Sequence, residues 1–414
     1  MRVANVVRRT HNPPHHFGMA VIKMDAEHEH PEGSLFDRIV DRRGSDSIKW
    51  SYYDSDVLPL WVADMDFPSP PAVVDALRER VNHGVFGYPT EPPELREIVV
   101  DRLKRLYDWP VSPDALVFLP NVAVAFNLAC HAVAEPGDGV LIQTPVYFPI
   151  LWIPKNVRLT ANLNELQRTS SGTYEIDFEA FEAAITERTR VFVLCNPQNP
   201  VSRVFTETEL GRLAEICLRH DVVICSDEIH ADFVYDGRRH VPIASLGSEI
   251  ERRTVTLLAP NKTFNIAGIS CAIAVVPDED LRQRLRGAQG GLVPHIGILS
   301  FTAALAAYRD GDAWLAELIE YLQRNRDLLA DFVAAELPSV ELTPVEGTYL
   351  AWLDCRGAVA ENPHEFFLRE ARVAVNDGPV FGQGGEGFVR LNFGCPRSAL
   401  QEALRRMRDA LLRS

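Results

Sequence analysis

The stretch TVTLLAPNKTFNIAG, residues 254–268, places a lone lysine, Lys262, just after a run of apolar and β-branched residues. Such a run predicts a buried β-strand over 254–258. Burial lowers the pKa of a lysine, and an unprotonated lysine can form an imine with an aldehyde. The alternative is a lysine at a loop edge whose charged end reaches solvent. Motifs elsewhere in the chain have to decide between the two.

Similar strand-length runs lie on the N-terminal side of this stretch, with helical patterns between most of them. Fully apolar strands separated by helices are typical of a mostly parallel sheet covered on both faces, so the fold class is α/β. Ligands bind such sheets beyond the carboxyl ends of the strands. The predicted strands besides 254–258 are 115–119, 139–143, 191–195 and 222–226.

The pattern changes after about residue 295, to long amphipathic helices over roughly 297–337, β-rich stretches at 346–354 and 388–393, and a final helix from about Ser398. This predicts a smaller α/β domain that packs closely on the first. We therefore divide the chain into a flexible N-terminal arm whose histidines are solvated, a small domain in two segments, and a large domain. Their ranges are 1–33 for the arm, 34–70 and 296–414 for the small domain, and 71–295 for the large one.

Composition limits the function. The chain has 414 residues, of which 46% are hydrophobic and 24% charged, and its formal charge of -15 would repel nucleic acid and anionic lipid. No apolar run has the ~20 residues of a membrane helix. The seven cysteines form no C-x-x-C pair, so we expect reduced, mostly buried thiols, no metal site and a cytoplasmic enzyme.

Polar residues follow several of the predicted strands. Asp227 begins D-E-I-H at the end of 222–226, and Asn199 lies in the rigid turn N-P-Q-N-P after 191–195. After this turn, Thr206-x-x-Glu209 predicts a capping box that starts a helix. A helix from about Val122 would offer free backbone N–H groups to a phosphate. Taken singly, each signal is weak: acidic strand ends are often solvated, and Asn-Pro is a common turn.

Together these motifs resemble a known family. F-G-Y-P, T-P-V-Y-F-P, N-P-Q-N-P, S-D-E-I-H, N-K-T-F-N-I-A-G and R-L-N-F, in this order, look like the fold-type I pyridoxal-5′-phosphate (PLP) enzymes of the aspartate aminotransferase type, class I/II. The stretch L-P-L-W-V-A-D-M-D-F (58–67) together with D-E-I-H is similar to the cystathionine β-lyase (MalY/PatB) subgroup. The resemblance covers about residue 34 to the end.

The resemblance implies a role for each matching position. Lys262 would hold PLP as a Schiff base, Asp227 would pair with the pyridine nitrogen, and Arg390 would bind the substrate α-carboxylate. Ala63 would also contact the substrate. The remaining cofactor contacts would be Asn199 to the ring's 3′-oxygen, Tyr147 and His230 beside the ring, the Val122 and Ala123 N–H groups to the phosphate, and Tyr88 from the second subunit of a homodimer.

Some positions depart from the family pattern. Ala259 and Asn261 stand where serine is usual, and Ser270 where aminotransferases commonly have a phosphate-binding arginine. Ser202 and Asn121 replace common glycines. The lost hydroxyl and guanidinium groups predict a looser or rearranged phosphate site.

Three functions stay open. The lyase-like motifs favour cleavage of a cysteine S-conjugate or cystathionine-like thioether to a thiol, pyruvate and ammonia over transamination of an amino acid. Both reactions use the same catalytic groups. A third function, binding of a regulatory partner, is disfavoured because Lys262, Asp227 and Arg390 are all present.

Overall fold

The computed structural model describes residues 34–337 and 339–414, and residues Leu35–Ser414 form one compact unit. The predicted N-terminal arm, 1–33, lies outside the described residues. No helix in the described part of the chain has the length and apolar character needed to cross a membrane. All seven cysteines are free and buried, as expected.

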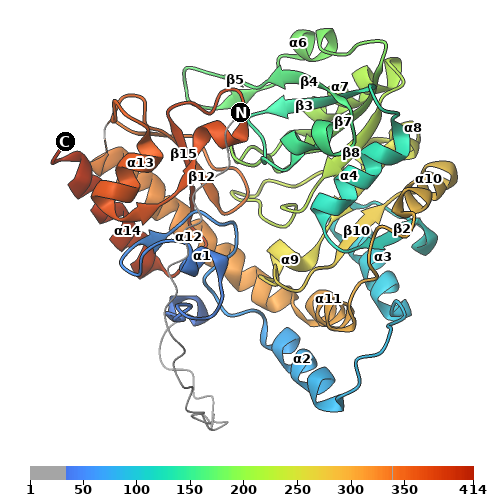
Figure 1. The fold of residues 1–414 in the computed structure, drawn as a ribbon, viewed down its shortest axis with the longest axis horizontal. Coiled ribbons are helices and arrows are strands. Elements are labelled where there is room, and N and C mark those ends of the chain that lie inside the picture. Colours follow the sequence, from blue (N-terminus) through green and yellow to red (C-terminus); the bar gives the residue numbers. More distant parts are fainter. Residues whose placement is uncertain (1–33, 338) are drawn as a thin grey trace, which may run out of the picture. The chain divides into compact units, whose positions relative to one another are not determined.

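A seven-stranded sheet forms the centre of the unit, in the order β2-β10-β9-β8-β7-β3-β4 (Figure 1). All its strands run parallel except β10, which is antiparallel to both of its neighbours. The mostly parallel sheet is thereby confirmed. The strands are β2 Leu116–Leu119, β3 Gly139–Thr144, β4 Thr160–Glu165, β7 Thr189–Cys195, β8 Val223–Asp227, β9 Thr254–Leu258 and β10 Ala272–Val275.

Two of these strands were not predicted as members of the sheet. Strand β4 has the polar sequence T-A-N-L-N-E and is largely exposed, because it lies at the edge of the sheet with one neighbour only. Strand β10 is a short apolar run. Its composition predicts neither its position between β2 and β9 nor its direction in the sheet. Edge position and strand direction depend on the rest of the sheet.

Fourteen α-helices accompany the strands in the described residues. The predicted capping box at Thr206 and Glu209 is present and begins α7. The predicted helix from Val122 is α4, which the Asn121 side chain caps. The helices are α1 Ile48–Ser51, α2 Pro71–His83, α3 Pro93–Tyr107, α4 Val122–Val133, α5 Ile153–Asn156, α6 Phe178–Ala183, α7 Glu207–Arg219, α8 Ser248–Arg252, α9 Pro260–Thr263, α10 Glu279–Gln289, α11 Ile298–Asp310, α12 Asp312–Glu336, α13 Pro363–Phe366 and α14 Arg397–Leu411.

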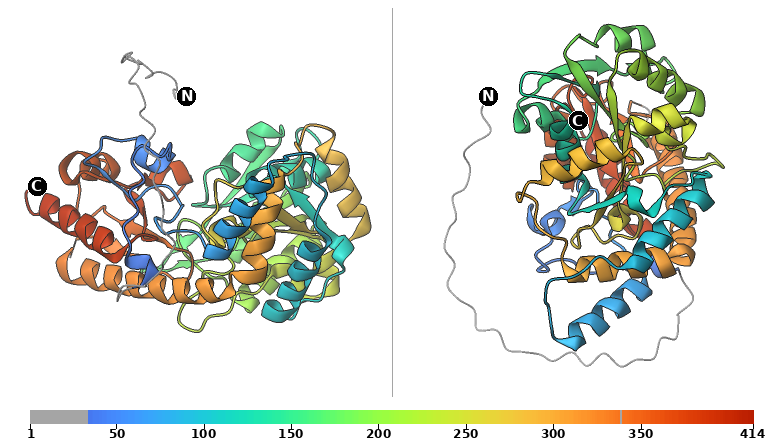
Figure 2. Two further views of the ribbon diagram at one scale, coloured as in Figure 1. Left: turned by 90° about the horizontal axis from the view of Figure 1, so that it is seen from below. Right: turned by 90° about the vertical axis from the view of Figure 1, so that its right-hand side faces the viewer.

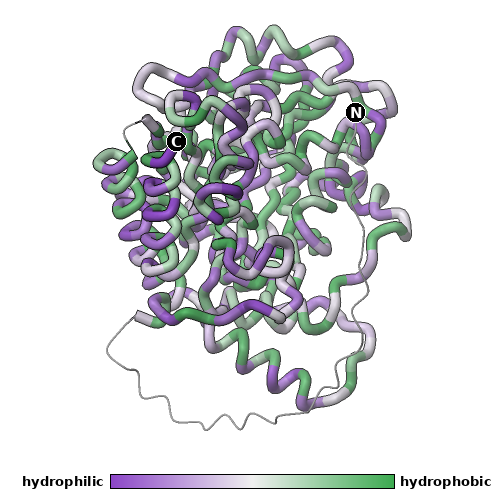
Figure 3. Tube along the Cα trace, turned by 60° about the vertical axis from the view of Figure 1, so that its left-hand side comes forward, coloured by the Kyte–Doolittle hydropathy of each residue, from purple (hydrophilic) through white to green (hydrophobic). Residues whose placement is uncertain are grey.

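Both faces of the large sheet are covered. Along β7, Val191 and Val193 pack into the apolar cluster that includes α4 and α10, whereas Phe192 and Leu194 pack into the cluster that includes α6 and α7. Alternate side chains of a strand point to opposite faces, so a strand covered on both faces is apolar throughout. Figure 3 shows the complementary pattern in the outer helices, where hydrophobic and hydrophilic positions alternate along the chain.

A smaller, four-stranded sheet, β11-β12-β15-β14, is built from residues after 340. Short strand β1, from the N-terminal segment, pairs in parallel with β13 beside it. Helix α12 runs from this C-terminal part toward the large sheet (Figure 2). The division into a large and a small domain stays a prediction. The strands are β1 Leu58–Pro59, β11 Glu341–Leu342, β12 Leu350–Asp354, β13 Val373–Ala374, β14 Asn376–Asp377 and β15 Phe388–Asn392; β5 Gln167–Arg168 and β6 Tyr174–Glu175 form a separate hairpin.

Candidate active site

A cavity of about 420 Å³ lies where the carboxyl ends of β7, β8 and β9 meet. Asp227 is the last residue of β8, and Lys262 lies in α9 directly after β9. Adjacent parallel strands bring these distant residues together at one edge of the sheet. The cavity is lined by Trp61, Val62, Ala63, Asn121, Val122, Ala123, Tyr147, Phe148, Cys195, Asn199, Asp227, Ile229, His230, Ala259, Asn261, Lys262, Ala267, Ser270, Asn376 and Arg390.

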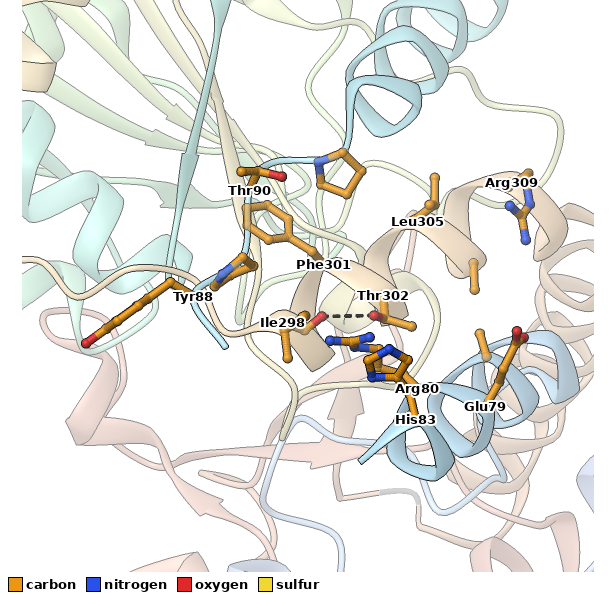
Figure 4. Close-up of a pocket in the computed structure, with 14 residues that line it drawn as sticks. Glu79, Arg80, His83, Tyr88, Thr90, Ile298, Phe301, Thr302, Leu305 and Arg309 are labelled. Atoms are coloured by element: carbon orange, nitrogen blue, oxygen red, sulfur yellow. Dashed lines mark hydrogen bonds between the residues drawn. The ribbon is translucent and has the colours of Figure 1, made fainter. Parts of the chain in front are cut away.

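Every residue predicted for the site lines this cavity except Tyr88. Tyr88 follows α2, and its side chain is 97% exposed. It borders a different pocket, between α2 and α11, and points away from the other residues of that pocket (Figure 4). Within this one chain, therefore, the structure does not bring Tyr88 to the cavity.

Asp227 is a buried carboxylate with few partners. Its Oδ1 accepts a hydrogen bond from the backbone N–H of Ile229 at 3.2 Å. Burial raises its pKa to about 7, from an ordinary 3.8, although the Ile229 hydrogen bond opposes the shift. A carboxylate in this position favours a cationic group opposite it, because a positive charge would restore its ionised form.

Lys262 is partly buried at the wall of the same cavity. Burial lowers its pKa to about 8, from an ordinary 10.5, and the charge of Asp64 opposes that shift. Its Nζ donates to the backbone carbonyl of Ala63, which also accepts from the Tyr349 hydroxyl at 2.9 Å. With this pKa, about a tenth of the amine is unprotonated at pH 7, and the unprotonated form is the one that attacks an aldehyde. The surface-lysine alternative is thereby excluded.

Arg390 lies on β15, buried at the wall of the cavity. Its guanidinium donates to Asn199 Oδ1 at 2.9 Å, to the Trp61 carbonyl at 2.9 Å and to Asn376 Oδ1 at 2.5 Å. Within the described residues none of these acceptors is a carboxylate. Burial lowers its pKa to about 10, so it stays charged at neutral pH. A buried guanidinium without a counter-ion is suited to an anionic ligand.

The hydrogen bond from Arg390 also orients Asn199. Because Asn199 Oδ1 accepts from the arginine, its Nδ2 end is left as the donor toward the cavity side. Beside it, burial lowers the pKa of His230 well below its ordinary value, and the charges of Lys262 and Arg390 add to the effect, so the imidazole is neutral. Its Nδ1 has no hydrogen-bond partner within the described chain.

Two of the departures from the family pattern have structural roles. Asn121 Oδ1 accepts from the Val124 N–H at 2.8 Å, which caps α4 while the N–H groups of Val122 and Ala123 stay at the cavity wall. Ser202 adopts a left-handed φ of 59°, which glycine would adopt without strain, and its Oγ donates to the Leu350 carbonyl at 2.6 Å. The serine thus ties the Asn-Pro turn to β12.

The backbone of 61–66 carries a function that the sequence did not reveal. This irregular segment supplies the Trp61 carbonyl to Arg390 and the Ala63 carbonyl to Lys262. Asn392 Nδ2 fixes it by donating to the carbonyls of Val62 at 2.6 Å and Asp64 at 2.7 Å. The segment therefore positions both cations of the cavity.

An ion cluster of Arg42, Lys49, Asp64 and Asp66 anchors the other side of this segment. The Lys49 side chain is fully buried, and its Nζ lies 2.7 Å from Asp66 Oδ2 and 3.5 Å from Asp64 Oδ1. Arg42 bridges the same carboxylates at 2.7 and 2.6 Å. One indication of this cluster was present in the sequence: Asp64 and Asp66 lie inside the apolar motif W-V-A-D-M-D-F. Carboxylates buried in such a segment need cationic partners. The partners could not be identified from sequence spacing.

Comparisons with known proteins match nearly the whole described chain. The model of the aminotransferase class I and II family matches residues 55–407. The cystathionine β-lyase PatB of Bacillus subtilis (strain 168) is 38% identical over 390 residues, which cover 91% of this chain and 99% of PatB.

Solved structures agree with that match. The crystal structure of cystalysin from Treponema denticola, which contains PLP, has a TM-score of 0.88 at 31% identity and covers 91% of this chain and 98% of its own. The PLP-bound C–S lyase from Staphylococcus hominis has a TM-score of 0.85 at 32% identity and covers the same shares, 91% and 98%.

Proposed function

The chain belongs to the aminotransferase class I and II family, and from this membership we propose that it is a PLP-dependent carbon–sulfur β-lyase. The expected fold type I and the expected PLP cofactor are confirmed by the family and by its PLP-bound structural neighbours. The substrate would be a cysteine S-conjugate or a cystathionine-like thioether.

The cavity of this chain fits PLP. Asp227 is a buried carboxylate whose raised pKa would return toward normal beside a protonated pyridine nitrogen. Lys262 is a partly buried amine of lowered pKa, suited to the aldehyde of the cofactor. The start of α4 presents its first N–H groups to the same cavity, where they can receive a phosphate. These are the three kinds of group that the cofactor requires.

We assign roles to the residues on that basis. When bound in the cavity, PLP would supply an aldehyde for the substrate amine and an electron sink for the electron pair left on Cα. Arg390 receives the substrate carboxylate and so fixes Cα in the cavity. Lys262 takes the Cα proton, and the Ala63 carbonyl orients its Nζ. Asn199 and Tyr147 are assigned to the ring's oxygen and face, His230 to its surroundings, and Val122 and Ala123 to the phosphate.

The overall reaction balances as a β-elimination. The Cα–H and Cβ–S bonds break, the thiolate leaves with the Cβ–S electron pair and takes up a proton, and the remaining aminoacrylate is hydrolysed to pyruvate and ammonia. The observation that carries this choice over transamination is the similarity, over nearly the full length, to proteins named cystathionine β-lyase and C–S lyase. Transamination stays the second candidate, because the family includes aminotransferases and the same residues serve both reactions.

The test is to incubate the purified, PLP-saturated protein with L-cystathionine and with S-alkyl-L-cysteines, with and without a keto acid. We expect thiol and pyruvate to form at the same rate in both conditions. Product that requires the keto acid would mean an aminotransferase. Bound PLP without turnover of any amino acid would favour the regulatory binding protein.

The capture of PLP by the apoprotein should depend on pH. Lys262 attacks only when unprotonated, and its pKa is lowered to about 8. The protonated form predominates below that value, so the capture rate should fall about tenfold for each pH unit below it, and level off above it. Stopped-flow absorbance of PLP mixed with apoprotein measures this rate. A pH midpoint near 10, as for an exposed lysine, would contradict the assignment.

We further propose a homodimer whose active sites lie at the subunit interface. The exposed segment after α2 carries Val85, Phe86 and Tyr88, each more than half exposed, a surface of the kind that a second subunit covers. Tyr88 points away from its own pocket (Figure 4), so it is free to reach the phosphate of the partner's cofactor.

We also propose a cytoplasmic location for the enzyme, because its buried free thiols fit a reducing compartment.

Tyr88→Phe should weaken PLP retention roughly 10- to 100-fold, because a hydrogen bond to a charged group contributes on the order of 1.5–3 kcal/mol. Dialysis followed by cofactor absorbance measures retention. Mixing inactive Lys262→Ala subunits with inactive Tyr88→Ala subunits supplies the second test. A mixed dimer places both defects in one site and restores the other, so part of the activity should return. No recovery from confirmed mixed dimers would refute the shared site.

A further inference from the structure

Two series of aromatic side chains lead from the wall of the cavity to the protein surface. The first begins at Trp61, which lines the cavity, and continues to Tyr53 and Tyr52. The ring centroids lie 5.7 Å apart for Tyr53 and Trp61, and 5.2 Å apart for Tyr52 and Trp61. The indole N–H of Trp61 donates to the Lys49 carbonyl at 3.2 Å, which fixes the orientation of this ring. Tyr52 is 66% exposed, so the series ends in solvent.

The second series begins at Phe148, which also lines the cavity. Its ring contacts that of Trp152, with centroids 5.2 Å apart, and Trp152 is 54% exposed. Exposed aromatic residues that continue an apolar lining out to the surface offer flat contact area to a bound group. Rings favour other rings at these separations, in edge-to-face or offset arrangements.

The charged residues of the cavity also favour an uncharged group on the substrate sulfur. Among the described residues that line it, the cationic side chains are Lys262 and Arg390, and the proposed function uses both. A second carboxylate on the substrate would therefore meet no free cation of this chain. Moving an unpaired charge into such a cavity is costly, whereas an uncharged ring would be favoured by the aromatic walls.

We propose that the group expelled on sulfur is an uncharged thiol that carries an aromatic or heteroaromatic ring, bound between the Trp61 and Phe148 series. This inference rests on the proposed carbon–sulfur lyase function and specifies its substrate class. The small amino acid part of the substrate occupies the inner cavity at Arg390, and the ring extends outward toward Tyr52 and Trp152.

The experiment compares kcat/KM of the PLP-saturated protein for three substrates: S-methyl-, S-benzyl- and S-(2-carboxyethyl)-L-cysteine. Pyruvate formation measures each. The benzyl compound should exceed the carboxyethyl compound by about tenfold or more, because the latter carries an unpaired charge into the cavity. Tyr52→Ala and Trp152→Ala should each lower the benzyl-to-methyl ratio of kcat/KM roughly 3- to 10-fold, as expected for one ring contact. The methyl compound carries no ring and therefore serves as the reference.

Leu412→Ala is the matched control, since Leu412 is an exposed apolar residue that does not line the cavity. Its benzyl-to-methyl ratio should equal that of the unchanged protein. A preference for the carboxyethyl compound, or unchanged ratios in both aromatic variants, would overturn the inference while leaving a lyase. Altered sedimentation with unchanged ratios would assign these aromatic residues to the subunit contact and would also overturn it. Cleavage of none of the three substrates would instead refute the lyase function.

Discussion

Replacing Lys262 with alanine should lower carbon–sulfur cleavage roughly 10²- to 10⁴-fold, the usual contribution of a positioned general base. The variant should also lack the visible absorbance of the covalent link between Lys262 and PLP. Both effects have one cause: Lys262 is the lysine that lines the cavity, and burial lowers its pKa to about 8. Steady-state pyruvate formation and the absorbance spectrum of the purified variant measure them.

The matched control is Lys104→Ala, because Lys104 is an exposed lysine of α3 that does not line the cavity. Its activity and spectrum should match those of the unchanged protein. A Lys262→Ala variant that keeps the covalent band would show that another amine holds the cofactor. Retained weak PLP binding without the band is compatible with the assignment, because the contacts proposed for Asp227, Asn199 and the start of α4 would remain.

Replacing Lys49 with methionine should lower the free energy of unfolding by about 3–5 kcal/mol, the usual cost of breaking a buried ion pair from one side. The Lys49 side chain is fully buried between Asp64 and Asp66, and methionine would leave these carboxylates with Arg42 as their remaining cation. Turnover should also fall, because the carbonyls of the same segment hold Arg390 and Lys262. Denaturant unfolding at matched protein and PLP concentrations measures the first effect.

The matched control is Arg43→Met, at a neighbouring cation that is 47% exposed and pairs with exposed Asp41. Exposed pairs contribute about 0–1 kcal/mol, so this variant should be nearly as stable as the unchanged protein. Equal stability of the Lys49 and Arg43 variants would contradict a supporting role for the cluster.

The ion cluster also predicts acid sensitivity. Burial by itself would raise the pKa of Asp64, but the hydrogen bond from Arg42 and the charges of Lys49 and Arg42 hold that pKa below its ordinary 3.8. The unfolded state therefore binds a proton at higher pH than the folded state does. The stabilisation from Asp64 is present at neutral pH and is lost as the pH falls through its folded pKa.

Local patterns predicted the elements that carry strong signals of their own. The apolar runs became β2, β3, β7, β8 and β9, and the capping box at Thr206 begins α7. The polar edge strand β4 and the antiparallel β10 carry no such signal, because the first is exposed and the direction of the second depends on its neighbours. The cationic partners of Asp64 and Asp66 were missed for a similar reason: they come from a segment that becomes adjacent only on folding.

The sequence by itself determined the fold class, the family and, apart from Tyr88, a set of site residues that all line the cavity, because apolar periodicity and motif order are properties of the chain. Only the tertiary structure decided their chemical state. Lys262 and Asp227 have pKa values near 8 and 7 because folding removes both from water, and desolvation depends on everything packed around a group. The tertiary structure also placed the carbonyls of Trp61 and Ala63 on Arg390 and Lys262, through contacts between residues some 200 to 330 positions apart.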